Sequence, residues 1–226
     1  MTPTRQRCSE VVDPIGWRLV LGTLITHVAV GSLGEAVRAA AAAVDAAGAD
    51  GAGHLSVDLA DRRAVLRLHD HATGTVTDLD LALARRISAA LATADLVTAP
   101  GDATATPQAM EIAIDALDIT AVRPFWRAVT GYVDGPHPPD LPPGALVDPL
   151  GRGPVIWFQQ MDRPRHAHRN RIHLDVDVPP EYAQSRIYAA LAAGGRLVSA
   201  DAAPAFWVLA DVEGNEVCVC TWQGRD

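Results

Sequence analysis

Histidines and carboxylates in two parts of the chain have the chemistry for proton transfer or for metal binding. His54 and His71 lie at the ends of stretches that alternate like strands. Imidazole titrates near neutral pH, so such a pair can supply a general acid and a general base. Farther along, glutamates and histidines such as Glu111, His173 and Glu216 have side chains that can ligate a divalent ion. Both kinds of chemistry depend on the elements that position these side chains.

The length of 226 residues favours two domains, each with its own core. Between them, residues 99–107 combine small residues with two prolines and a glycine and show no apolar period, which is typical of a solvated linker. The sequence therefore predicts a first domain over residues 1–98 and a second over residues 108–226.

The first domain is predicted to be α+β, an antiparallel sheet with helices on one face. A capping-box pattern at Ser32 and Glu35 opens a helix that Gly48 ends, and Thr77 with Asp80 repeats the pattern. The expected order is strand 23–30, helix to 47, strands 54–59 and 64–68, and helix 81–94.

The second domain reads as two successive strand-helix-strands units. The first unit has expected strands at 110–116, 145–148 and 154–160 around a helix at 119–129. The second has strands at 172–178, near 197, at 206–210 and at 217–221, with a helix at 181–193. Such an order predicts a structural repeat, in which neither half could bury its sheet alone.

The first domain resembles pterin-4a-carbinolamine dehydratase over residues 16–94. The likeness rests on His54, on the stretch from His71 to Ala82, and on Gly16-Trp17-Arg18 before the first strand. It implies removal of water from a 4a-hydroxytetrahydropterin, with His54 and His71 as the proton-transfer pair and Asp80 orienting one of them. A pterin ligand would follow.

The sequence departs from that family where Gly53 replaces the first histidine of a His-His-Pro motif, Leu55 replaces the proline, and Asp61 stands in place of an aromatic residue. Loss of one proton-handling group costs about 10²- to 10⁴-fold, so slow dehydration is expected. The histidines could instead be ordinary strand-end residues, and Asp80 caps its helix in either case.

The second domain resembles glyoxalase-like domains of the vicinal oxygen chelate superfamily, with paired βαβββ modules. The likeness rests on the strand that holds His173, the helix after it, and the final strand entered through Asp211-Val212-Glu213-Gly214-Asn215-Glu216. It implies a ligand cavity shared by the two halves, with Glu111, His173 and Glu216 converging on it.

The same resemblance puts Trp157, which cannot ligate, at a fourth metal position, so a divalent metal is not the favoured expectation and no metal residue is assigned. Gln159 could line a pocket for an organic ligand. His173 could instead hold its strand through Asp175, and Glu216 could merely begin the last strand after a turn.

Composition indicates which classes of partner and which compartment to expect. The net charge of -8 opposes phosphate backbones, so no nucleic acid is expected. No apolar run approaches the roughly 20 residues that cross a bilayer, and the three cysteines favour a reducing compartment. Cys218 and Cys220 share one face of a strand and should pack rather than bridge. A cytoplasmic protein that binds a small molecule is expected.

Two functions follow. The first is a lyase-like enzyme or binding protein for a pterin or related heterocycle. The alternative is a protein that sequesters a ligand without turnover and whose first domain serves only for self-association, since the dehydratase resemblance implies a homo-oligomer.

Overall fold

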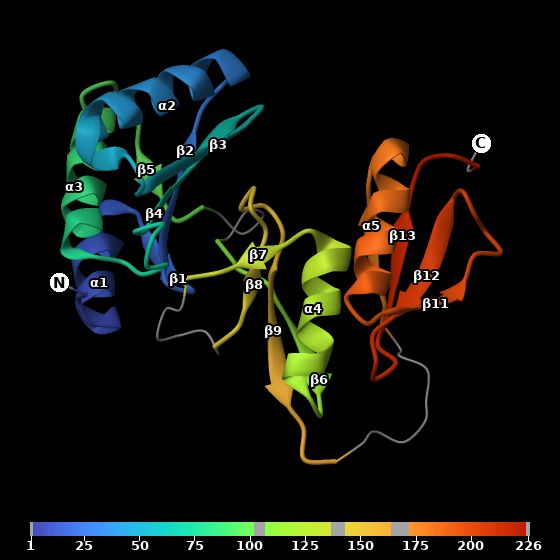
Figure 1. Ribbon diagram of the computed structural model, residues 1–226. Coiled ribbons are helices and arrows are strands. Elements are labelled where there is room, and N and C mark those ends of the chain that lie inside the picture. The colour runs from blue at the N-terminus through green and yellow to red at the C-terminus, as the bar shows by residue number, and fades with distance from the viewer. Residues whose placement is uncertain (1, 102–106, 137–142, 164–171, 225–226) are drawn as a thin grey trace. The chain divides into compact units, whose positions relative to one another are not determined.

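The computed structural model describes residues 2–101, 107–136, 143–163 and 172–224. The chain forms two compact units, one of Met1–Ala109 with Pro136–Leu141, the other of Met110–Gly135 with Pro142–Asp226 (Figure 1). The middle of the expected linker lies outside the described residues, as do the proline-containing segment 137–142 and the arginine- and histidine-containing segment 164–171.

The first unit is an antiparallel sheet covered by helices. Its strands follow the order β1-β2-β4-β3, and β5 pairs with β2. In chain order the elements are α1 (Arg5–Val12), β1 (Arg18–Val20), β2 (Thr23–Ala29), α2 (Leu33–Ala47), β3 (Leu55–Ala60), β4 (Arg63–Leu68), α3 (Asp78–Ala92) and β5 (Thr98–Ala99).

One face of this sheet packs against the helices. Ala64, Leu66 and Leu68 alternate along β4 and are wholly buried, as period-two patterning requires. On α2, alanines at 36, 39, 43 and 47 form the buried stripe, and their small size lets the helix approach the strands closely. The sheet and its helices share one core.

The N-terminal elements α1 and β1 were not expected from the sequence. Thr4 caps α1 by accepting a hydrogen bond from the Arg7 N–H. Trp17 is wholly buried between these elements, and its Nε1 donates to Ser88 Oγ at 2.9 Å. Both elements are short; β1 pairs with the next strand, β2, and the Trp17–Ser88 hydrogen bond joins this segment to α3.

The second unit contains two four-stranded sheets of the same topology. The first has the order β6-β9-β8-β7 and the second β10-β13-β12-β11. In each sheet, the strand that comes first along the chain pairs in parallel with the strand that comes last, β6 with β9 and β10 with β13. The elements are β6 (Glu111–Ala116), α4 (Ile119–Thr130), β7 (Val133–Asp134), β8 (Leu146–Val147), β9 (Val155–Gln160), β10 (Leu174–Asp177), α5 (Pro180–Ala192), β11 (Arg196–Ser199), β12 (Phe206–Ala210) and β13 (Glu216–Cys220). The expected repeat and the mixed α+β class are confirmed.

Helices α4 and α5 lie side by side between these two sheets (Figure 1). Phe125 and Val129 of α4, Ile187 of α5, and Ile156 and Val217 of the strands belong to one core. Each sheet therefore buries its inner face on the helices, which directs its outer face away from the other sheet. Among the described residues, no helix combines the length and the apolar character needed to cross a bilayer.

Candidate functional site

In the first unit, His54 and Asp80 form a hydrogen-bonded pair. His54 lies just before β3, and its Nδ1 is 2.8 Å from Asp80 Oδ1. The Asp80 side chain is fully buried, whereas 16% of the His54 side chain is exposed. Because a carboxylate oxygen only accepts, this bond places the proton on Nδ1 and leaves Nε2 as the free acceptor.

The start of α3 fixes Asp80 in place. Its second carboxylate oxygen, Oδ2, accepts from both the N–H and the hydroxyl of Thr77 at 2.7 Å. This is the capping box predicted from the sequence. Asp80 thus joins the start of the helix to the imidazole of His54, so the structural role of a cap and the orientation of His54 are both present in one residue.

Two further histidines lie at the adjoining end of β4. The backbone N–H of His71 donates to Gly53 O, and that of His69 donates to His54 O, so the end of β4 is held beside the start of β3. His71 Nε2 is 3.3 Å from Ser56 Oγ, and the rings of His69 and His71 have centroids 4.9 Å apart. The structure therefore gathers three imidazoles and one buried carboxylate at this end of the sheet.

His69 was not among the predicted site residues. Its Nδ1 is buried and has no hydrogen-bond partner within the described part of the chain. Burial lowers the pKa of His69, the charge of His71 lowers it further, and the nearby Asp80 opposes the shift. His69 is therefore held neutral. The signal for His69 in the sequence was its position, two residues before His71.

In the second unit the predicted ligand residues occupy two different sheets. Glu111 is exposed on β6 and Gln159 is exposed on β9, both on the outer face of the first sheet because Ile114 and Phe158 fill the inner face. Glu216 begins β13, and His173 directly precedes β10 in the second sheet.

Within the ranges that the structure describes, Glu111 does not converge with His173 and Glu216 on one hollow, contrary to the prediction. Helices α4 and α5 separate the two outer faces, so a metal set built from all three residues does not fit this structure. Trp157 is half-buried on β9 and offers no metal ligand.

The turn from β12 to β13 explains part of the motif that precedes Glu216. Asp211 is buried and accepts from the N–H groups of Glu213 and Asn215, from the Asn215 amide and from Trp126 Nε1. The Glu213 carboxylate in turn accepts from the N–H groups of Leu117 and Asp118, next to the start of α4. The Asp-x-x-Gly-Asn segment therefore stabilises the packing of the two halves.

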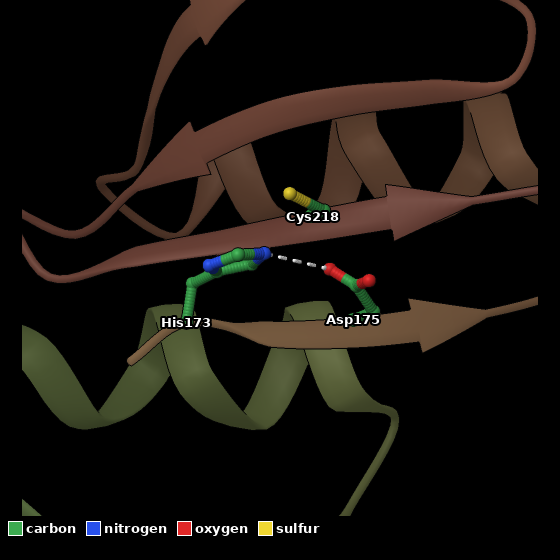
Figure 2. A group of neighbouring side chains, drawn as sticks. All are labelled: His173, Asp175 and Cys218. Atoms are coloured by element: carbon green, nitrogen blue, oxygen red, sulfur yellow. Dashed lines mark ion pairs between the residues drawn. The ribbon is translucent and has the colours of Figure 1, made fainter. Parts of the chain in front are cut away.

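His173 instead belongs to a cluster on the outer face of the second sheet (Figure 2). Its Nε2 is 3.4 Å from Asp175 Oδ1. Asp175 pairs in register with Cys218 across the parallel strands β10 and β13. The three residues line a cavity of about 450 Å³ with Phe206 and Cys220. The sequence predicted His173 here, but not Asp175 or Cys218 as functional residues.

The Cys218 thiol is strongly perturbed. Burial first, and then the charge and hydrogen bond of Asp175, raise its pKa to about 11. Both Cys218 and Cys220 are buried and free of disulfide bonds, which confirms the prediction that they do not bridge. A neutral thiol beside a carboxylate and an imidazole results.

Comparison with known proteins identifies one part of the chain. Residues 111–220 match the family model described as a glyoxalase-like domain. No curated protein matches the sequence.

Several solved structures are similar to about half of the chain. A hypothetical protein SA1046 from S. aureus is 14% identical, with 52% of this chain and 96% of that one covered and a TM-score of 0.39. A glyoxalase/bleomycin resistance protein/dioxygenase family enzyme from Burkholderia phytofirmans PsJN is 21% identical, with 49% and 95% covered and a TM-score of 0.40. The fosfomycin resistance protein FosX from Mesorhizobium loti is 8% identical, with 49% and 88% covered and a TM-score of 0.38.

Proposed function

Because residues 111–220 form a glyoxalase-like domain of the vicinal oxygen chelate superfamily, we infer that the protein binds or modifies a small molecule. We propose that the first unit catalyses the reaction. The proposed reaction is the dehydration of a pterin 4a-carbinolamine. The glyoxalase-like domain would bind a small organic ligand of related chemistry.

The observation that carries this proposal is the pairing of His54 with the buried Asp80 beside His71. Dehydration of a carbinolamine needs one group that protonates the departing hydroxyl and one that accepts the proton on N5. The structure offers two imidazoles for these tasks, and Asp80 orients one of them. A buried, doubly hydrogen-bonded carboxylate is a costly feature in a unit that needs only a helix cap.

The bond to Asp80 assigns the roles. His54 presents Nε2 as an acceptor, and the imidazolium formed after it takes the N5 proton is stabilised by Asp80. His71, in its protonated form, donates to the 4a-hydroxyl. The C4a–O bond then breaks, water leaves, and the N5–H electron pair becomes the C4a–N5 double bond of the quinonoid dihydropterin. Solvent returns the proton from His54 to His71.

Gly53 makes this reaction slow. The resemblance to the dehydratases implies a histidine at this position, and its loss removes one proton-handling group, an effect of about 10²- to 10⁴-fold. His69 adds a half-buried neutral imidazole beside His71, but it lies just after β4 and not at position 53, before β3, where the resemblance implies the histidine.

The experiment is to generate a 4a-hydroxytetrahydropterin and to follow quinonoid dihydropterin by absorbance. We expect a rate above the uncatalysed one that is lost in His54→Ala and in His71→Ala. His173→Ala, an equal loss of an imidazole in the other unit, should keep the rate. A wild-type rate equal to the uncatalysed one, with the protein folded, would reject the proposal.

Ligand sequestration without turnover is the rival function, and the cavity beside Phe206 and Cys220 favours it. In this reading His173 and Glu216 contact the ligand on one sheet, and Glu111 and Gln159 contact it on the other. Isothermal titration that shows tight binding of a heterocycle, without product and without dependence on His54, would support sequestration over dehydration.

Self-association completes our proposal. Because the outer faces that hold Glu111 and His173 are separated by α4 and α5, only a second copy of the chain could bring two such faces onto one ligand. Sedimentation of the full chain should therefore show a homo-oligomer. Comparison with residues 108–226 alone would show whether the first unit is needed for assembly.

A further inference from the structure

Three side chains with different donor atoms meet on the outer face of the second sheet. They are the imidazole of His173, the carboxylate of Asp175 and the thiol of Cys218, and their ligand atoms all lie within 4.8 Å of one another. Figure 2 shows His173 and Asp175 facing each other from one strand and Cys218 on the neighbouring strand.

Strand geometry brings the three together. Residues 173 and 175 share a face because side chains alternate along a strand. The parallel register of β10 with β13 then sets Asp175 opposite Cys218. No loop rearrangement is needed, since adjacent backbones hold all three residues.

We propose that His173, Asp175 and Cys218 form a binding site for a thiophilic divalent cation of the zinc class, with the fourth position open toward the cavity. One nitrogen, one oxygen and one sulfur ligand suit zinc and its substitute cobalt. This inference is independent of the dehydration reaction and uses neither Glu111 nor Glu216.

The distances fit such an ion. Metal–ligand bonds of about 2.0 to 2.3 Å place tetrahedral ligands roughly 3.3 to 3.8 Å apart. The 3.4 Å between His173 Nε2 and Asp175 Oδ1 lies within this range, and no separation among the three ligand atoms is more than 4.8 Å, about 1 Å above it. The side chains of His173 and Asp175 are about half-exposed, at 50% and 53%, so changes of rotamer can close the difference while Cys218 remains fixed in the sheet.

A nucleophilic cysteine is the competing interpretation, and its surroundings oppose it. Reactive cysteines have a lowered pKa, whereas burial and, after it, Asp175 raise the pKa of Cys218. A bound cation reverses this arrangement: the thiol proton leaves to solvent, a metal–sulfur bond forms, and the carboxylate that opposed the thiolate becomes a second ligand.

The test is titration of the full-length, metal-free protein with Co²⁺. Thiolate bound to Co²⁺ gives a near-ultraviolet charge-transfer band, and tetrahedral coordination gives visible bands. We expect both bands at one equivalent, and Zn²⁺ should abolish them by displacement. Loss of a residue that hydrogen-bonds to a metal ligand lowers metal affinity about 10- to 100-fold. Loss of a ligand itself should cost at least as much, so His173→Ala and Asp175→Asn should weaken binding by at least about tenfold.

Matched cysteine variants decide the outcome. Cys218→Ser should lose the charge-transfer band, whereas Cys220→Ser, two residues along the same face, and Cys8→Ser should keep it. Circular dichroism would establish that each variant is folded. Absence of a thiolate band in the folded wild-type protein, its survival in Cys218→Ser, or unchanged affinity in His173→Ala would overturn the proposal.

Discussion

Asp80 accepts a hydrogen bond from His54 at 2.8 Å through one carboxylate oxygen and caps α3 through the other. One buried side chain therefore links the start of a helix to His54, which lies 26 residues earlier in the chain, just before β3. Because a carboxylate only accepts, this bond requires a proton on Nδ1 of His54.

Asp80→Asn should impair dehydration through His54. An asparagine can still cap the helix, but if its amide nitrogen faces Nδ1, the imidazole proton moves to Nε2 and the base is lost. We expect the rate to fall by about 10²- to 10⁴-fold. Nitrogen-15 NMR of the histidine rings would reveal the change of tautomer. A large loss of rate without a change of tautomer would contradict the positioning role.

His69 should make the first unit less stable in mild acid. Its pKa is lowered from 6.5 in the folded protein by burial and by His71, so below about pH 6.5 the unfolded chain binds a proton that the folded chain does not. The free energy of unfolding should therefore decrease as pH falls through this range. Urea unfolding at several pH values would measure it. His69→Gln should reduce the decrease, and His173→Gln in the other unit should not.

Cys218 should react slowly with iodoacetamide at pH 8. Its pKa of about 11 keeps the thiol protonated, and only the thiolate attacks. Reactivity should rise as pH approaches 11. Asp175→Asn removes the negative charge that opposes the thiolate, so it should lower the pKa of Cys218 and speed the modification. Peptide mapping by mass spectrometry would separate Cys218 from Cys220. Equal rates in the wild type and in Asp175→Asn would contradict the role of Asp175.

Gly131→Ala should destabilise the second unit more than Gly151→Ala. Both glycines have positive φ, +74° and +65°, and a left-handed conformation costs an alanine about 1 to 2 kcal/mol. At Gly131 an added Cβ would also lie 2.1 Å from Arg186 Nη1, whereas at Gly151 it meets nothing within 4 Å. Thermal unfolding of both variants isolates the contact with Arg186, and equal losses of stability would argue against it.

The sequence predicted the elements whose local pattern is strong. The capping residues Ser32 and Thr77 begin α2 and α3 as expected, and the repeat in the second unit has the predicted order. Shorter elements such as β1 and β7 were missed, because two or three residues are too few to show an apolar period, and pairing with the next strand defines each of them.

The candidate sites were predictable only in part, because their geometry depends on pairing between distant segments. The meeting of Asp175 with Cys218 requires the parallel register of two strands more than 40 residues apart, which no local pattern reports. The separation of Glu111 from His173 has the same origin, since the packing of α4 against α5 decides which way each sheet faces.

Gly53→His should increase the dehydration rate. Gly53 immediately precedes His54, it is exposed, and an added Cβ there meets no atom within 4 Å, so a larger side chain has room. Its φ of +74° is left-handed, a region that histidine enters more readily than most residues, and the strain should cost about 1 kcal/mol. The variant should therefore unfold at a slightly lower temperature and yet turn over faster.

The gain at Gly53 should depend on the rest of the site. If the new imidazole supplies the missing proton-handling group, the increase can reach about 10²- to 10⁴-fold, and it should vanish when His71→Ala is combined with Gly53→His. Gly53→Asn, which tolerates the same backbone conformation but transfers no proton, provides the control for backbone effects. An equal rate in the histidine and asparagine variants would show that the slow reaction has a cause other than the lost imidazole.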